Sequence, residues 1–186
     1  MSVARQSAMD QGITVWLTGL PSAGKSTIAR EAAGWLRATG RQVQVLDGDE
    51  IRRNLTRDLG FGRADREENV RRIGFVAKLL STNGIITLVP VIAPYAASRS
   101  LVRDQHRADG VGYAEVYVAT PVDVCSCRDV KGLYAKQRAG ELHGLTGVDD
   151  PYEPPTDPAL TLPTQTQSPQ ESADAVYAVL SERGLV

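Results

Sequence analysis

The feature that most constrains the fold is the stretch GITVWLTGLPSAGKSTIAR at residues 12–30, where an apolar run meets a glycine-rich turn and then a helical pattern. The β-branched residues at 13–15 predict a buried strand. A helix should run from Lys25 to about Thr39 and end at Gly40. A strand that enters a helix through a tight glycine turn is typical of α/β proteins with a parallel sheet.

The turn from Gly19 to Ser26 reads G-L-P-S-A-G-K-S and matches the pattern G-x-x-x-x-G-K-[ST] at every fixed position. Its glycines let successive backbone N–H groups surround phosphate oxygens, and the following helix adds the positive end of its dipole. We expect Lys25 to reach the β- and γ-phosphates of a nucleotide and the Ser26 hydroxyl to bind Mg²⁺.

Bulk properties restrict the class of protein. A chain of 186 residues with 42% hydrophobic content suits one core, so we predict a flexible N-terminal tail at 1–11 and a single domain at 12–186. The net charge of −1 argues against nucleic-acid partners and anionic membranes. Two cysteines, Cys125 and Cys127, suit a reducing compartment. No apolar stretch is long enough to span a bilayer, and we expect a soluble cytoplasmic protein.

Three further strands are predicted within RQVQVLDGDE (41–50), GIITLVPVIAP (84–94) and YAEVYVAT (113–120), with helical segments between them. This alternation predicts a parallel sheet with helices on both faces. Ligands bind such sheets at the carboxyl ends of the strands. Both the phosphate-binding turn and the DGD sequence at 47–49 follow strand ends.

Two helix starts are visible in the sequence. Asp65, with Glu68 three residues on, is the expected N-cap of one helix. Ser168 is the expected N-cap of another, with Pro169 at its first position and Glu171 completing a capping box.

The regular pattern disappears between residues 128 and 163, which hold five of the ten prolines. We predict a mobile lid over about 128–150, followed by an extended return. Arg128, Lys131 and Lys136 are candidates to close over phosphates, and the alternative is that they are ordinary exposed charges.

A phosphate-binding turn is compatible with an ATPase, a GTP switch, a motor or a small-molecule kinase. The guanine signature N-K-x-D does not occur, which argues against a switch. A kinase needs a carboxylate for the acceptor hydroxyl and cations for the transferring oxygens. Asp47 and Asp49, two apart in an extended chain, should face the same side. We predict Lys25, Asp47 and Asp49 as catalytic residues, with Asp49 at the acceptor hydroxyl and Asp47 in a water-mediated Mg²⁺ or orienting role. The alternative for either carboxylate is a helix cap or turn.

An anionic acceptor would need a basic face. Arg66 and Asn69 are three apart at the start of one helix, so they share a face, and Arg52 lies one turn after Asp49. The alternative is salt bridging within a mixed-charge surface.

At this point the chain resembles the adenylylsulfate kinase (adenosine 5′-phosphosulfate, APS, kinase) family over residues 12–185. The stretches that carry the resemblance are GLPSAGKST, DGDEIRRNL, DLGFGRADREENVRRIGFVAKLL, RDVKGLYAKQRAGE, LTGVDDPYEPP and SPQESADAVYAVL. The resemblance implies a P-loop NTPase fold and ATP-dependent phosphorylation of the 3′-hydroxyl of APS in sulfate assimilation. The products would be 3′-phosphoadenylyl sulfate (PAPS) and ADP. It also implies Mg²⁺ and a homodimer.

The family motifs assign roles to positions of this chain. The implied ATP-binding residues are Gly19, Leu20, Pro21, Ser22, Ala23, Gly24, Lys25, Ser26, Thr27 and Arg128. The implied substrate-binding residues are Asp49, Arg52, Phe61, Arg66, Asn69, Ile92, Ala93, Lys131 and Leu145. Phe61 would offer its ring to the adenine of APS.

The sequence departs from the family pattern on the acceptor side. Ala93 stands where the family has serine, which argues against a phosphoserine step and favours direct transfer from ATP. Ala96 replaces an arginine, Glu50 an asparagine and Leu145 a phenylalanine that sandwiches adenine. One alternative is therefore a kinase of the same scaffold with another nucleotide-like or anionic acceptor. A second is a noncatalytic nucleotide-binding partner.

Overall fold

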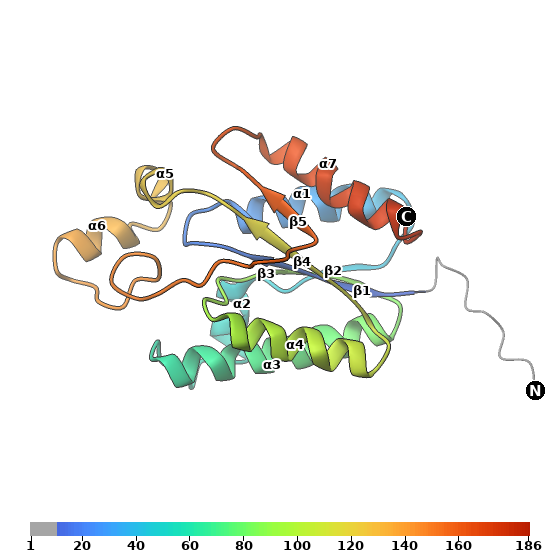
Figure 1. The fold of residues 1–186 in the computed structure, drawn as a ribbon, viewed down its shortest axis with the longest axis horizontal. Coiled ribbons are helices and arrows are strands. Elements are labelled where there is room, and N and C mark those ends of the chain that lie inside the picture. Colours follow the sequence, from blue (N-terminus) through green and yellow to red (C-terminus); the bar gives the residue numbers. More distant parts are fainter. Residues whose placement is uncertain (1–10) are drawn as a thin grey trace, which may run out of the picture.

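A single parallel sheet of five strands organises residues 11–186, the part of the chain that the computed structural model describes (Figure 1). Residues 1–10, most of the expected tail, lie outside the described residues. The strand order is β2-β3-β1-β4-β5, and each neighbouring pair is parallel. This confirms the predicted sheet. The strands are β1 (Ile13–Thr18), β2 (Val43–Val45), β3 (Ile86–Pro90), β4 (Gly112–Val118) and β5 (Leu160–Leu162).

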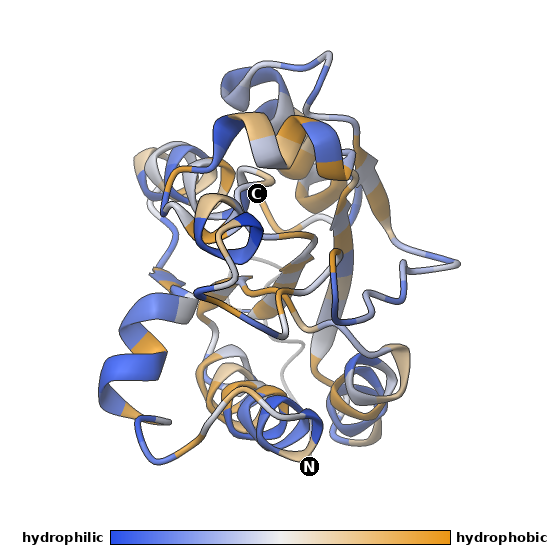
Figure 2. Ribbon diagram, turned by 90° about the vertical axis from the view of Figure 1, so that its left-hand side faces the viewer, coloured by the Kyte–Doolittle hydropathy of each residue, from blue (hydrophilic) through white to orange (hydrophobic). Residues whose placement is uncertain are grey.

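Helices cover both faces of the sheet (Figures 1 and 2). One face carries α1 (Lys25–Ala38) and α7 (Pro169–Glu182), and the other carries α3 (Arg63–Thr82) and α4 (Ala96–Ala108). Successive side chains of a strand point to opposite faces, so β1 contributes to two cores. Val15 and Leu17 pack in the core on the α1 side, whereas Trp16 packs in the core on the α3 side. Burial on both sides explains why these strands are almost continuously apolar.

The helix starts were predicted with mixed success. The capping box of α7 is confirmed: the Ser168 hydroxyl accepts from the Glu171 N–H, and the Glu171 carboxylate accepts from the Ser168 N–H. The predicted N-cap of α3 is wrong, because α3 begins at Arg63 with Gly62 as N-cap. Asp65 lies in the first turn instead, where a negative charge interacts favourably with the helix dipole.

Further short elements complete the fold, and only the last two of them lie wholly within residues 128–163, where the sequence showed no regular pattern. They are α2 (Gly48–Asn54), α5 (Val122–Arg128) and α6 (Leu133–Arg138), together with β5 in the expected extended return. Below, residues 128–150 are called the lid segment; α6 lies within it. The Asp129 carboxylate accepts hydrogen bonds from the N–H groups of Tyr134 and Ala135 and so fixes the start of α6. Within residues 11–186, no helix combines the length and the apolarity needed to cross a membrane.

Candidate active site

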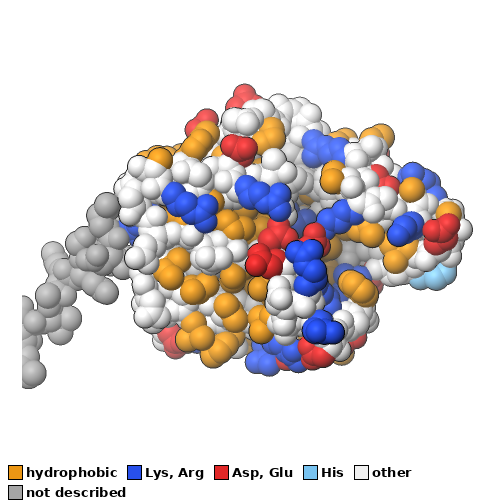
Figure 3. Space-filling view, turned by 180° about the vertical axis from the view of Figure 1, so that it is seen from behind, with side chains coloured by type: hydrophobic (Ala, Val, Ile, Leu, Met, Phe, Trp, Pro, Cys, Tyr) orange, Lys and Arg blue, Asp and Glu red, His pale blue; other side chains and the backbone are white. Residues whose placement is uncertain are grey.

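A cavity of about 890 Å³ opens beside the carboxyl ends of β1 and β3. Its walls come from the phosphate-binding turn, the start of α2, the loop before α3, the loop after β3, the lid segment and the start of α7. In the space-filling view from behind, acidic side chains gather at the centre of the face with Lys and Arg side chains around them (Figure 3).

The phosphate-binding turn has the backbone shape that the motif predicts. Gly19 has φ 154°, and a Cβ there would lie 2.6 Å from the carbonyl oxygen of Val118, so only glycine fits against β4. Gly24 is the N-cap of α1 and has φ 103°, and no side chain of the described residues 11–186 caps this helix. The first N–H groups of α1 therefore remain available to an anion, in line with the positive end of the helix dipole.

The Lys25 side chain packs against the phosphate-binding turn. Its Nζ donates to the carbonyl oxygens of Gly19 at 2.9 Å and Leu20 at 2.7 Å. The residue is 8% exposed, and burial lowers the pKa of its ammonium group to about 7. A phosphate at this position would favour the charged form, because it places negative charge beside a desolvated cation.

Asp47 and Asp49 both line the cavity, but the predicted geometry between them is wrong. They do not lie on an extended strand, because β2 ends at Val45 and α2 begins at Gly48. Asp47 is the N-cap of α2 and accepts from the Asp49 N–H at 3.0 Å, so the cap alternative holds for it. Its other oxygen lies 3.3 Å from Arg30. The Asp49 carboxylate pairs with Lys131 of the lid segment.

Arg66 and Asn69 line the same cavity from one face of α3, as their spacing predicted. Arg66 donates to the carbonyl oxygens of Phe61 and Gly144, both at 2.7 Å, and lies 3.4 Å from Asp150. The basic residue therefore ties the lid segment to α3 and also takes part in an ion pair.

The loop before α3 presents an aromatic ring. Phe61 is 71% exposed at the cavity wall, and the Arg52 guanidinium lies 4.8 Å from the centre of its ring. Arg52 also donates to the carbonyl oxygens of Leu59 and Gly60. A guanidinium over the ring stabilises it by a cation–π interaction and fixes the loop.

Ile92 and Ala93 line the cavity from the loop after β3, whereas Leu145 does not. Leu145 is 5% exposed and packs in the core on the α1 side. Its N–H donates to the Asp149 carboxylate at 2.7 Å. Leu145, which stands in place of the family phenylalanine, is thus a core residue in this conformation.

A profile of the family described as adenylylsulphate kinase matches residues 11–163. The chain belongs to the adenylylsulfate kinase family. Two relatives called adenylyl-sulfate kinase, from Halothermothrix orenii and from Synechococcus sp. strain JA-2-3B'a(2-13), are each 52% identical to it. The first match covers 95% of this chain and 93% of the relative, and the second covers 95% and 98%.

Solved structures of the same family also match this chain. The APS kinase CysC of Mycobacterium tuberculosis, in complex with AMPPNP and APS, superposes with a TM-score of 0.89 at 46% identity. The match covers 92% of this chain and 98% of that one. A hexameric APS kinase from Thiobacillus denitrificans has a TM-score of 0.73 and 35% identity, covering 96% of this chain and 30% of that chain. The chain therefore has the P-loop NTPase fold of this kinase family.

Several cavity residues of this family member were missed from the sequence, among them three polar residues near the start of α7. Gln167, just before α7, and Ser172, in its first turn, line the cavity, and their Oε1 and Oγ atoms are buried with no hydrogen-bond partner among residues 11–186. Arg128 and Thr164 lie at the same end, with a 2.6 Å hydrogen bond from the guanidinium to the Thr164 carbonyl. Nothing in the local sequence indicates that this segment approaches the phosphate-binding turn.

The donor atoms at the phosphate-binding turn fit Mg²⁺. Ser26 offers a hydroxyl and Asp47 and Asp49 offer carboxylates at the same cavity, and hard oxygen ligands are those that Mg²⁺ prefers. Within residues 11–186, no group of three or more His, Cys, Asp and Glu side chains is placed to hold a metal ion. A bound Mg²⁺ would therefore draw further ligands from nucleotide phosphates and water.

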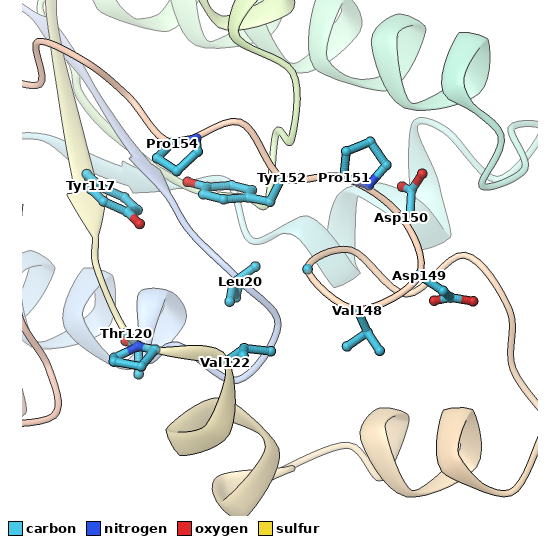
Figure 4. A pocket seen from close by; sticks show the side chains of 12 residues that line it. Leu20, Tyr117, Thr120, Val122, Val148, Asp149, Asp150, Pro151, Tyr152 and Pro154 are labelled. Atoms are coloured by element: carbon cyan, nitrogen blue, oxygen red, sulfur yellow. The ribbon is translucent and has the colours of Figure 1, made fainter.

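A second hollow of about 570 Å³ lies beside the same turn (Figure 4). Leu20 forms part of its wall, together with Tyr117 at the end of β4 and Tyr152 in the extended return. The two tyrosine rings stack with their centres 6.1 Å apart. The return of the chain from the lid segment is thereby packed against the sheet.

Proposed function

We propose that this chain transfers the γ-phosphoryl group of ATP to the 3′-hydroxyl of APS, giving PAPS and ADP. The observation that carries the proposal is one cavity that joins a phosphate-binding turn to a basic and aromatic wall. The family match supports it, and a relative at 46% identity binds both AMPPNP and APS.

Each side of the cavity has its own task in this reaction. Lys25 and the N-terminus of α1 stabilise the charge on the transferring phosphoryl group, which is the main catalytic contribution in such reactions. Asp49 accepts the proton of the acceptor hydroxyl. For this, the ion pair between Asp49 and Lys131 opens when the substrate binds. Arg66, Asn69 and Arg52 hold the anionic acceptor, with Phe61 against its base.

Ser26 and, through water, Asp47 would hold Mg²⁺. When bound, the ion neutralises charge on the β- and γ-phosphates. The buried Ala93 has no hydroxyl to phosphorylate, so the proposal is a direct transfer between the two substrates.

We also infer a homodimer. Phe75 and Leu79, one turn apart on α3, and Leu101 on the adjoining α4 are about half exposed, and exposed apolar surface of this kind favours association. Both cysteines are free, which supports a place in the reducing cytoplasm.

The test is release of ADP from Mg·ATP by the purified protein, with and without micromolar APS, and identification of PAPS by mass spectrometry. APS-dependent release is expected. Lys25→Ala serves as the inactive control, with at least about a hundredfold loss, as for other removed transition-state donors. ATP binding without APS-dependent release would contradict the proposal and favour a different acceptor.

A further inference from the structure

The loop after β3 is fixed from three directions. Residues 92–94, which we call the acceptor loop, line the cavity, and each of their three carbonyl oxygens accepts a hydrogen bond from a different part of the fold. The donors are the Thr18 hydroxyl to Ile92 at 2.6 Å, Arg99 Nη1 to Ala93 at 2.7 Å and the Glu153 N–H to Pro94 at 2.8 Å.

Ala93 shows why this support is needed. Its φ of 44° lies in the left-handed region, which residues other than glycine, asparagine and aspartate rarely adopt. Such a conformation persists only where the surroundings determine it. The bonds to residues 92–94 supply that constraint.

Thr18 and Arg99 also hold the start of the extended return. We call Tyr152 and Glu153 the lid root. The Tyr152 hydroxyl lies 3.0 Å from the Thr18 hydroxyl, and because Thr18 donates to the acceptor loop, Tyr152 donates to Thr18. Arg99 Nη2 donates to the Glu153 carbonyl at 2.6 Å, and the Glu153 carboxylate accepts from the Ala96 N–H.

Arg99 can serve both segments because its charge is balanced elsewhere. The residue is 3% exposed, and its Nε donates to the buried Glu115 carboxylate on β4 at 2.6 Å. This pairing leaves the two Nη groups free for the carbonyl oxygens. A planar guanidinium spreads its donors over three nitrogens and so reaches the carboxylate and both carbonyl oxygens at once, whereas an ammonium would have to reach all three from a single nitrogen.

The lid segment has a different anchor on the side of the phosphate-binding turn. The buried Tyr134 of α6 donates from its hydroxyl to the Pro21 carbonyl at 3.1 Å. One tyrosine therefore ties the lid segment to the turn, while Tyr152 ties the lid root to the acceptor loop through Thr18.

We propose that Thr18, Arg99 and Tyr152 are positioning residues for the acceptor, which hold the acceptor loop and the lid root as one unit. The inference rests on the proposed function, because it names the residues that align the acceptor in that reaction. Tyr134, in contrast, positions the ATP side. Loss of the Tyr152 hydroxyl should then impair use of APS, and loss of the Tyr134 hydroxyl should impair use of ATP.

The experiment compares KM for APS, KM for ATP and kcat in four proteins: the wild type, Tyr152→Phe, Tyr134→Phe and Tyr117→Phe. Tyr117 is the matched control, because its ring stacks on Tyr152 but its hydroxyl is not part of the network. Tyr152→Phe should raise the KM for APS about fivefold, the factor that one lost hydrogen bond represents, and leave the KM for ATP within about twofold. Tyr134→Phe should instead raise the KM for ATP and leave the KM for APS within about twofold.

Arg99→Lys provides a second variant, since it keeps the charge beside Glu115 but loses at least one carbonyl contact. It should also raise the KM for APS selectively, and thermal unfolding is recorded for every variant. Equal changes in both KM values, an equal effect of Tyr117→Phe, or a change in stability alone would overturn the inference. Absence of APS-dependent turnover in the wild type would instead overturn the proposed function, so the two failures are distinguishable.

Discussion

Lys25 is the residue where burial and function oppose each other most directly. Its pKa is lowered to about 7 by desolvation, so near neutral pH the free protein holds it only partly charged. Between pH 7 and the ordinary value of 10.5, the unfolded chain binds more protons at this group than the folded chain does. The folded state without nucleotide therefore gains stability from this group as the pH rises through that window.

The same shift predicts how ATP affinity depends on pH. Above pH 7, binding must return a proton to Lys25, so the Kd for ATP should rise by up to about tenfold per pH unit. Calorimetry at pH 6.5, 7.5 and 8.5 measures this. Lys25→Arg is the control, because a guanidinium stays charged throughout the range. An identical pH dependence in both proteins would show that Lys25 keeps its proton in the free enzyme.

Gln167 carries the second prediction. Its buried Oε1 has no hydrogen-bond partner in the described part of the chain, and a buried unpaired acceptor is costly unless a ligand satisfies it. Gln167→Leu should therefore raise the KM for ATP about tenfold and leave the KM for APS unchanged in steady-state assays. Gln165→Leu, an exposed position two residues earlier, is the matched control. Equal effects of the two substitutions would exclude a nucleotide contact by Gln167.

The residues of the candidate site differ in how well the sequence predicted them. Lys25 and Ser26 belong to a motif whose spacing dictates their chemistry, so they were predicted with their surroundings. Asp47 and Asp49 were predicted at the cavity, but through the wrong local geometry. A helix start could have been predicted there, because Asp47 with Glu50 three residues on is the same N-cap pattern as Asp65 with Glu68. Gln167 and Ser172 were missed, since only the packing of α7 beside α1 brings them to the turn.

Among the helices and strands, the predictions that were confirmed rest on local sequence signals. The capping box fixed the start of α7, and the apolar runs fixed β1 and β3. By contrast, β5 has three residues, Leu160–Leu162, and exists because β4 offers it an edge to pair with. The short helix α6 likewise depends on the Asp129 carboxylate and on the buried Tyr134. Such tertiary support leaves no periodic pattern in the sequence.

Packing of the lid segment against the phosphate-binding turn gives the third prediction. Gly147 has φ 89°, and a Cβ there would lie 2.4 Å from Leu20 Cδ2. Gly147→Ala should lower the free energy of unfolding by about 2 kcal/mol, half from backbone strain and half from displacement of Leu20. Because the Leu20 carbonyl accepts from Lys25, the KM for ATP should also rise.

Gly140 is the matched control in the lid segment. It has φ 73°, but a Cβ there meets nothing within 4 Å. Gly140→Ala should therefore show only the backbone cost of about 1 kcal/mol in urea unfolding, with an unchanged KM for ATP. If the two alanine variants behave alike, the contact between the lid segment and Leu20 has no part in nucleotide binding.

Across the molecule, the phosphate-binding turn and the acceptor loop line one cavity. The lid segment contacts the turn through Tyr134, and the lid root contacts the acceptor loop through Glu153. The resemblance over residues 12–185 predicted this arrangement because its motifs occur in the family order. It did not predict which conformation the lid segment adopts. Leu145 packs in the core and does not line the cavity, and its N–H donates to the Asp149 carboxylate.

Assembly provides the last prediction. Phe75 and Leu79, one turn apart on α3, are 51% and 48% exposed, and Leu101 on the adjoining α4 is 48% exposed. A partner that covers α3 and α4 would therefore bury apolar surface of both copies. We expect a dimer for the wild type by light scattering after gel filtration, and Phe75→Glu should shift the mass to that of a monomer. A charge placed in a buried apolar interface is strongly unfavourable without a partner.

Val122→Glu, at a similarly exposed residue on α5, should leave the mass unchanged. A wild-type monomer, or a dimer that tolerates Phe75→Glu, would exclude the α3 and α4 face as the interface.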